Sequence, residues 1–365
     1  MRALVVLAFL AATSSCADDA WREPLGPGGA TPDAGDGGGS EAAAPLACAS
    51  RSVSTLAGSS AGFKEGSAGP NGIARLDGVR GIAVFSTVLA FVADRNNQRV
   101  RNLLFDGGDC EVWAGSGLAG FADGAAEEAK LSSPEGVATD AAGTVWVGDT
   151  ANHAIRRVAG GKVTTVAGDG SAGFTDGTTA RFDSPTGVAV DANGNVLVAD
   201  RGNHAIRRIS PAGETSTLAG DGSAGFADGT GAAARFATPW AVAVDAKGIA
   251  WVTDTGNDRV RRVDAGGQVS TFAGGDGSLL APMGIALDAL GNVYVADSGH
   301  RRVVRLAASG ELTILAGSGA SGSSDGPSGD ASFSELSGLA FAEAYAGGGL
   351  LVGDAHRVRL VHCKD

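Results

Sequence analysis

The chain has few of the features that several broad classes of function require. Its 365 residues include 28 Lys and Arg against 40 Asp and Glu, a formal net charge of −12. A nucleic-acid binder needs a basic surface to displace counterions from phosphates, so this balance argues against one. Aromatic residues make up 5% and charged residues 19%, whereas Gly alone accounts for 59 residues. Such a composition argues against a helical bundle and favours many short strands joined by Gly-rich turns.

Long hydrophobic runs are also lacking. The apolar run at residues 3–12 is too short to span a bilayer, and it lies between Arg2 and the sequence TSSC at residues 13–16. This is the layout of a cleaved export signal. It resembles a bacterial lipoprotein signal, in which the cysteine is lipidated and becomes the new N-terminus, so Cys16 is the expected lipidation site. Thr13 stands where an aliphatic residue is usual, and ordinary cleavage after Ala17 is the alternative.

The chain divides into three parts by composition. Residues 1–16 form the signal peptide with its lipobox. Residues 17–46 are rich in Gly, Ala, Pro and Asp and hold almost nothing to bury, so they predict a disordered tether. Residues 47–365 form the folded domain.

An internal repeat dominates that domain. One copy reads FDSPTGVAVDANGNVLVADRGNHAIRRI, and its neighbours are nearly superimposable on it. A marker Asp ends the second predicted strand of each copy, at Asp94, Asp149, Asp200, Asp254, Asp297 and Asp354. Successive markers are 43 to 57 residues apart. A repeat of roughly 40–50 residues with four short strands is typical of β-propeller blades.

The turn after each marker allows the family to be named. Asn152-His153 and Asn203-His204, within D-x-x-N-H-x-I-R-R, resemble NHL repeats, and so does the spacing from P-x-G-V-A through D-x-x-G. The resemblance covers roughly residues 52–361. It implies an all-β, six-bladed propeller of four-stranded blades. It says little about function, because NHL propellers bind proteins, RNA or glycans and a few relatives are enzymes.

The two ends of the domain are expected to complete one blade together. The sixth copy stops after its third strand at residues 358–361, and residues 53–57 (VSTLA) match the fourth strand TSTLA at residues 215–219. An N-terminal strand that closes the ring removes an exposed edge. Cys48 and Cys363 then fall where the missing hairpin tip would be, which predicts a disulfide between them in an oxidising compartment. Cys110 is expected to be a free, partly buried thiol.

Positions that break the repeat are the best candidates for a binding site. The residue before each inner strand should lie at one mouth of the central channel, while its flanking Gly and Val are nearly constant. This position differs in every blade and is occupied by Arg80, Glu135, Thr186, Trp240, Met283 and Ser337. Such a ring could hold a ligand, with Trp240 stacking on a sugar or aromatic ring and Arg80 and Glu135 orienting polar groups. The alternative is surface drift, with Trp240 shielding the channel.

Catalytic motifs have no credible setting in this sequence. H-E-x-x-H and C-x-x-C are absent, and the literal G-x-S-x-G and G-x-G-x-x-G matches lead into no helix. Each marker Asp is expected to bond turn amides or the Asn three residues on. A ring of these carboxylates around Ca²⁺ is the competing interpretation. The repeated loops of the type GDGSAGFTDG lack calcium-loop spacing, and their Phe63, Phe121, Phe174 and Phe226 are expected to plug gaps between blades.

These observations favour a binding or scaffold module for a protein, peptide or glycan. The predicted module is a monomer, is held in the cell envelope outside the cytoplasm by an N-terminal lipid, and needs no cofactor. A soluble secreted or periplasmic protein is the alternative localisation. The alternative function is a metal-dependent propeller enzyme of the lactonase or lyase type, with its site on the propeller axis.

Overall fold

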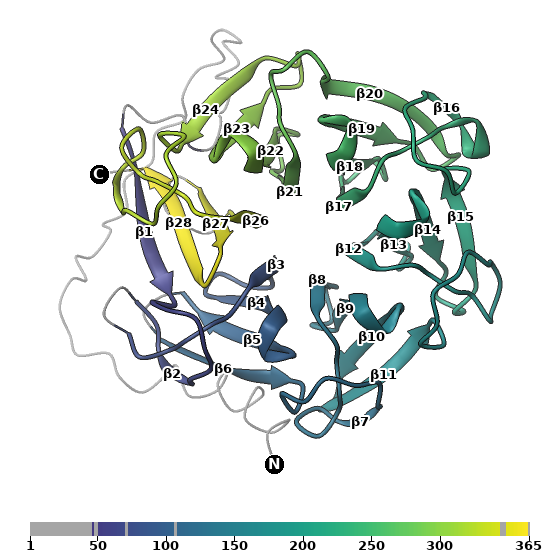
Figure 1. Cartoon of the computed structure of the whole chain (residues 1–365), viewed down its shortest axis with the longest axis horizontal. Helices are drawn as coiled ribbons and strands as arrows, with labels where there is room; N and C mark the ends of the chain where they lie inside the picture. Colours follow the sequence, from purple (N-terminus) through teal and green to yellow (C-terminus); the bar gives the residue numbers. More distant parts are fainter. Residues whose placement is uncertain (1–45, 47–49, 70–71, 106–107, 344–347, 364–365) are drawn as a thin grey trace, which may run out of the picture. The chain divides into compact units, whose positions relative to one another are not determined.

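The computed structural model describes residue 46 and residues 50–69, 72–105, 108–343 and 348–363, and these form a ring of six antiparallel sheets around a central axis (Figure 1). The six-bladed, all-β propeller expected from the sequence is therefore confirmed. The signal peptide, Cys16, the tether and Cys48 lie outside the described residues. No helix among the described residues is long and apolar enough to cross a membrane.

Each blade runs outward from an inner strand at the axis. Blade 1 contains β3 (Val79–Val84), β4 (Leu89–Asp94), β5 (Arg99–Leu104), β6 (Asp109–Ala114) and the short β2 (Gly66–Ser67). Blade 2 contains β8 (Pro134–Thr139), β9 (Val145–Asp149), β10 (Ala154–Ala159), β11 (Lys162–Ala167) and β7 (Gly124–Ala125). Blade 3 contains β12 (Pro185–Val190), β13 (Val196–Asp200), β14 (Ala205–Ile209) and β15 (Thr215–Ala219).

The remaining blades follow the same order. Blade 4 contains β17 (Pro239–Val244), β18 (Ala250–Asp254), β19 (Arg259–Val263), β20 (Gln268–Gly274) and β16 (Gly229–Thr230). Blade 5 contains β21 (Pro282–Leu287), β22 (Val293–Asp297), β23 (Arg302–Leu306) and β24 (Leu312–Ala316). Blade 6 contains β26 (Leu336–Ala342), β27 (Gly349–Asp354), β28 (Arg357–Cys363), β1 (Arg51–Ala57) and β25 (Gly326–Pro327).

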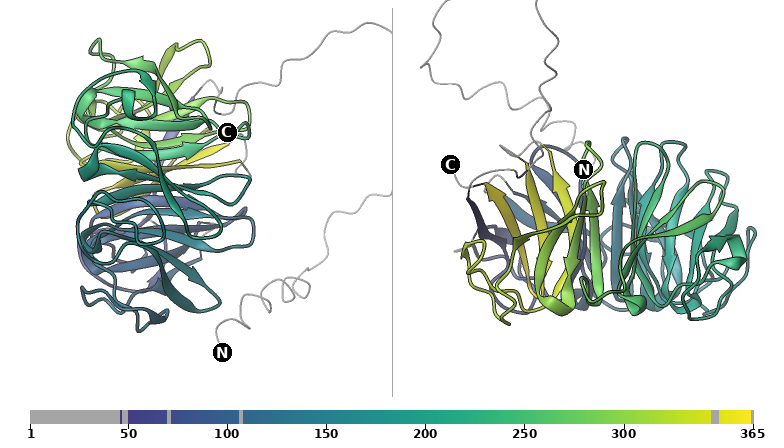
Figure 2. Two further views of the ribbon diagram at one scale, coloured as in Figure 1. Left: turned by 90° about the vertical axis from the view of Figure 1, so that its right-hand side faces the viewer. Right: turned by 90° about the horizontal axis from the view of Figure 1, so that it is seen from above.

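The N-terminal strand closes the ring as the sequence predicted. The purple strand β1 lies beside the yellow β28 (Figure 2). The two strands pair in antiparallel register, with Val53 opposite Val361 and Arg51 opposite Cys363. The same register joins Ile209 to Thr215 in blade 3, where a hairpin links the two strands. The closure therefore places Cys363 at the hairpin end of the blade, and its pairing with Cys48 stays a prediction.

Apolar side chains fill the spaces between neighbouring blades. Every residue of β13 and of β18 is buried, because the second strand of a blade has a sheet on each side. Small side chains dominate the inner strands, where the blades come closest. The alternation of buried and exposed residues that is typical of a sheet with one solvated face is therefore absent in the middle of each blade.

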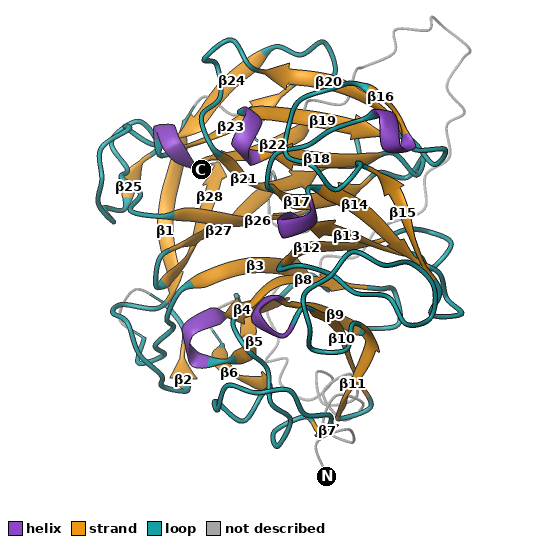
Figure 3. Cartoon of the chain, turned by 45° about the vertical axis from the view of Figure 1, so that its right-hand side comes forward, coloured by secondary structure: helices purple, strands orange, loops and turns teal. Residues whose placement is uncertain are grey.

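A short 3₁₀ helix follows the marker Asp in five blades and turns the chain into the third strand (Figure 3). These helices are η1 (Arg95–Asn97), η2 (Thr150–Asn152), η3 (Arg201–Asn203), η5 (Thr255–Asn257) and η6 (Ser298–His300); a further one, η4 (Gly231–Ala233), lies in a loop. The residue after each of the five adopts left-handed φ, for example 50° at His153. Together with the loops between blades, these helices define what we call the loop face of the propeller.

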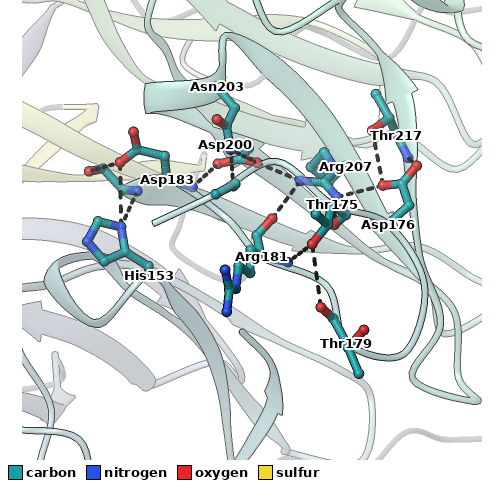
Figure 4. A network of polar contacts seen from close by, with 12 residues as sticks. His153, Thr175, Asp176, Thr179, Arg181, Asp183, Asp200, Asn203, Arg207 and Thr217 are labelled. Carbon is teal, nitrogen blue, oxygen red and sulfur yellow. Dashed lines mark hydrogen bonds and ion pairs between the residues drawn. The ribbon is translucent and has the colours of Figure 1, made fainter. Parts of the chain in front are cut away.

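The marker carboxylates are structural, as the sequence indicated. In blade 3, Asp200 accepts hydrogen bonds from the Asp183 amide at 2.8 Å, from Asn203 Nδ2 at 2.9 Å and from Arg207 Nη1 at 2.8 Å (Figure 4). Burial raises the pKa of Asp200 to about 6, although all three donors act in the opposite direction. Blades 1, 2 and 4 repeat this arrangement with their own Asn and Arg.

The loop phenylalanines differ from their prediction. The four residues Phe63, Phe121, Phe174 and Phe226 are 39–47% exposed, so they are not buried plugs, although Phe121 and Phe174 border Gly170 and Gly222 in the loop of the next blade. Each ring instead lies over an arginine guanidinium, as Phe174 does over Arg207 at 4.9 Å. Fully buried phenylalanines come later in two of these loops, at Phe182 after Phe174 and at Phe236 after Phe226. A cation–π contact stabilises a ring while leaving its other face in water, which periodicity alone does not reveal.

Candidate functional site

The six inner strands surround a cavity of about 270 Å³ on the propeller axis. Glycines let these strands approach one another closely. A Cβ added to Gly81 would lie 2.5 Å from the carbonyl oxygen of Glu135, and one added to Gly187 would lie 2.6 Å from the Cα of Ala241. Valine, alanine and isoleucine side chains supply most of the remaining lining. The channel is therefore narrow and apolar in its middle.

Four of the six predicted ring residues line this cavity: Arg80, Glu135, Thr186 and Trp240. We call this set the channel mouth, and it lies on the loop face because the inner strands begin there. Met283 and Ser337 are not among the lining residues. The structure thus brings together four side chains that are far apart in the sequence.

Two of the six predicted residues hold neighbouring blades together. The hydroxyl of Thr186 is fully buried and donates a hydrogen bond of 2.6 Å to the carbonyl oxygen of Trp240 in the next inner strand. Ser337, also fully buried, donates one of 2.7 Å to Val79 in the same way. Their variation between blades therefore reflects alternative ways of joining inner strands, and a ligand could reach neither hydroxyl without displacing the backbone.

Arg80 and Glu135 carry polar atoms without partners. Arg80 Nη2 forms an ion pair of 2.7 Å with Glu335, but its Nε and Nη1 are buried and make no hydrogen bond to any described residue. Glu135 is 5% exposed, and its Oε1 bonds Arg95 Nε at 2.8 Å, while Oε2 is buried and unpartnered among the described residues. An unmade hydrogen bond at a buried charged group costs more than about 1–3 kcal/mol, so these atoms are poised for an additional partner.

Trp240 lies half-buried beside them. The guanidinium of Arg201 lies 5.0 Å from the centre of its ring, a cation–π contact that holds the indole at the mouth. An indole face next to charged side chains suits a sugar ring or an aromatic group. The channel mouth therefore combines an anion-binding group, a carboxylate and a flat apolar surface within one small opening.

Sequence reasoning missed the residues that support the mouth. Arg95 and Arg201 directly follow their marker Asp, a position where blades 2, 4 and 5 have Thr150, Thr255 and Ser298. Those three hydroxyls donate to carbonyl oxygens of the next blade at 2.7–2.9 Å. The two arginines instead reach Glu135 and Trp240. The break in the repeat at this position was a usable signal.

The histidines of the repeated turn do not converge. His153 Nδ1 accepts a hydrogen bond from the Ser184 amide at 3.0 Å, and His204 Nδ1 accepts one from the Thr238 amide at 3.0 Å. Each therefore joins its blade to the loop of the next one. Within the described residues, no three His, Cys, Asp or Glu side chains form a group that could hold a metal ion.

Comparison with known proteins agrees with this architecture. The family model of the NHL repeat matches residues 131–157 and 182–209, which lie in blades 2 and 3. Over 132 residues the chain is 33% identical to Protein SUPPRESSOR OF QUENCHING 1, chloroplastic, of Arabidopsis thaliana. The matched part is 33% of this chain and only 12% of that protein.

Solved structures extend the likeness to nearly the whole ring. An auxiliary nutrient binding protein of Bacteroides ovatus superimposes with a TM-score of 0.65 at 14% identity, covering 87% of this chain and 77% of that one. A gluconolactonase of Xanthomonas campestris superimposes with a TM-score of 0.57 at 16% identity, covering 79% and 86%. At such identities the likeness shows a shared fold, which here accommodates both binding proteins and enzymes.

Proposed function

We propose that this chain, a six-bladed propeller containing NHL repeats, is a binding module that takes part of a peptide, protein or glycan at its channel mouth. The Nε and Nη1 of Arg80 and the Oε2 of Glu135, which have no hydrogen-bond partner among the described residues, carry the proposal; because these atoms are buried, the two side chains have to turn toward the cavity to meet a ligand. A hydrogen-bond acceptor of the ligand would bind the arginine, and a hydroxyl or ammonium group of the ligand would bind the carboxylate. The likeness to a nutrient-binding propeller supports a role in binding.

The size of the cavity limits what can enter it. A volume of about 270 Å³ is slightly below the range of roughly 300–1,000 Å³ typical of small-molecule sites. One sugar unit or one amino-acid side chain would fit in the mouth, with Trp240 against its flat face. The rest of a larger ligand would then lie over the surrounding loop face. A chain end or an exposed residue of a polymer is therefore the expected binding element.

The test measures binding to glycan and peptide arrays with the full chain, followed by titration calorimetry on any ligand that is found. Arg80→Gln and Trp240→Ala should each weaken binding at least tenfold. Arg157→Gln, an exposed arginine of β10 outside the cavity, is the matched control and should leave binding unchanged. If the wild type and all three variants bound the ligand with equal affinity, the channel mouth would not be the binding site.

A thermal-shift comparison with Ca²⁺, Zn²⁺ and EDTA separates this function from the metal-dependent enzyme. Binding without metal predicts the same melting temperature in all three. Stabilisation by several degrees that EDTA reverses would favour the enzyme and would direct attention to lactone substrates.

We further propose that lipidation of Cys16 holds the propeller in the cell envelope. The signal-like N-terminus and the tether-like composition of residues 17–46 support this. Membrane fractionation of cells expressing the wild type and Cys16→Ser tests it. Retention of both proteins in the membrane fraction would contradict lipid anchoring at this residue.

A further inference from the structure

Five of the six blades cover their own outer edge. In each, the loop that enters the blade doubles back and places a glycine against the fourth strand, with an acidic residue just before that glycine. In blade 2, Gly124 pairs with Val163, and Asp123 accepts a hydrogen bond of 3.0 Å from the Thr165 amide. The corresponding acidic residues are Glu65, Asp176, Asp228 and Asp325, whose carboxylates bind strand amides at 2.8–3.2 Å.

Blade 5 is the exception. Its entry loop, residues 275–281, has only three residues after the GDGS segment and lacks the later acid–glycine pair. Nothing in the described parts of the chain pairs with the outer side of β24. By alignment with Thr215 and Thr217 of blade 3, the amides of Leu312 and Ile314 point outward. The fifth blade therefore presents a β-strand edge whose outward backbone groups have no partner in the part of the chain that the structure describes.

Side chains around this edge have changed together with the loop. In the other five blades a fully buried arginine of the third strand, such as Arg156, binds the carbonyl oxygen of the covering loop. Val304 takes that position in blade 5. Ile314 replaces the threonine whose hydroxyl binds the loop carboxylate in four of the blades, and it is 49% exposed.

We propose that the edge of β24 is an acceptor for an extended peptide strand of a partner protein. An unpaired strand edge recruits a further strand through main-chain hydrogen bonds, and alternate side chains then set specificity. The five covered blades show the antiparallel geometry in which such a strand would bind. This inference does not depend on the channel mouth, which lies at the opposite, inner end of the blades.

The chemistry of the edge specifies the partner segment. Because the arginine and the threonine hydroxyl are missing, an acidic residue opposite Ile314 would find no cation or hydroxyl to bind. A backbone carbonyl of a regular strand would instead accept a hydrogen bond from the Ile314 amide. An apolar side chain of that strand would pack against the exposed Ile314. We therefore expect an extended segment with apolar residues at alternate positions.

The experiment uses the full chain and a fluorescently labelled synthetic peptide, Lys-Val-Thr-Val-Thr-Val-Lys, in an anisotropy titration. Saturable binding is expected. Ile314→Pro removes the outward amide without touching the inner ladder and should weaken binding at least tenfold. Ile314→Lys, which keeps that amide but replaces the apolar contact, gives the same test should the proline variant fold poorly. Leu290→Lys is the matched control, since Leu290 is an exposed leucine of the same blade on a turn away from the edge, and it should bind normally.

Three results would overturn the proposal. The first is no saturable binding, or binding that neither substitution at Ile314 weakens. The second is strong hydrogen-exchange protection of the Leu312 and Ile314 amides without peptide, which would mean that the chain covers its own edge. The third is a dimer in sedimentation experiments that Ile314→Pro dissociates, which would make a second copy the occupant.

Discussion

A single methyl group on the inner strand of blade 2 tests how the propeller axis is packed. In Gly136→Ala, the added carbon would overlap the carbonyl oxygen of Thr186 and would lie 3.0 Å from its carbonyl carbon and 3.1 Å from the Cα of Gly187. All three atoms belong to the backbone of the neighbouring inner strand, so no side chain can move aside. The two strands would have to separate.

The expected cost follows from that geometry. Overpacking a tight interior costs about 1–3 kcal/mol, and rigid backbone neighbours place this site at the upper end. Replacing Gly by Ala returns about 0.5–1 kcal/mol through lower entropy of the unfolded chain. A net loss of about 2 kcal/mol should lower the melting temperature by roughly 4–8 °C, using about 2–4 °C per kcal/mol for a large domain.

The assay is thermal unfolding followed by circular dichroism, with urea unfolding as a second measure of free energy. Gly329→Ala is the matched control, because no atom lies within 4 Å of its added carbon and its backbone is not left-handed. That variant should melt at or slightly above the wild-type temperature. If Gly136→Ala melted within a degree of the control, the inner strands would not be in the close contact described above.

Three further predictions concern the cysteines and the loop carboxylates. Peptide mapping without reductant should recover Cys48 joined to Cys363, and reduction should lower the free energy of unfolding by up to about 4–5 kcal/mol, the value for a very long loop; a free Cys363 would refute this. Burial raises the pKa of the Cys110 thiol to about 11, so iodoacetamide at pH 8 should modify it only after denaturation, and rapid labelling of the native protein would contradict its burial. The pKa of Asp176 is lowered, because hydrogen bonds from Thr217 and Arg207 outweigh the opposing effect of burial. The stability that its carboxylate adds is thus present above about pH 4 and declines as the pH falls further, so the difference in unfolding free energy between wild type and Asp176→Asn, measured by urea unfolding, should be smaller at pH 3 than at pH 6.

The fold could be predicted from sequence because every blade is encoded locally. The marker Asp is present in all six blades, and in blades 1 to 4 it is followed by an Asn three residues later and an Arg seven residues later, as in Asp200, Asn203 and Arg207. Glycines at tight turns and apolar second strands repeat with them. The ring closure was also predictable, because the fourth strand that the C-terminal copy of the repeat lacks is present at the N-terminal end of the domain.

The predicted roles of exposed side chains were less accurate. The loop phenylalanines were expected to fill gaps as buried rings, yet Phe174 rests on the Arg207 guanidinium and is 39% exposed. The sequence shows that an aromatic residue recurs, but a buried ring and a ring stacked on a cation have the same periodicity. Four-stranded blades were also expected, whereas the loops add a short fifth strand in four of them.

By itself, the sequence determined the six-bladed ring, its closing strand and which positions break the repeat, since these depend on patterns within one blade. The tertiary structure alone decided what the exceptional positions do. Arg80 and Glu135 are 55 residues apart in sequence numbering, and both line one cavity because the inner strands of blades 1 and 2 lie side by side at the axis. Thr186 and Ser337 were equally exceptional, yet each found a carbonyl on the next strand. Whether such a side chain lines the cavity or bonds a neighbouring strand depends on its contacts with the next blade. The sequence of one repeat does not contain those contacts.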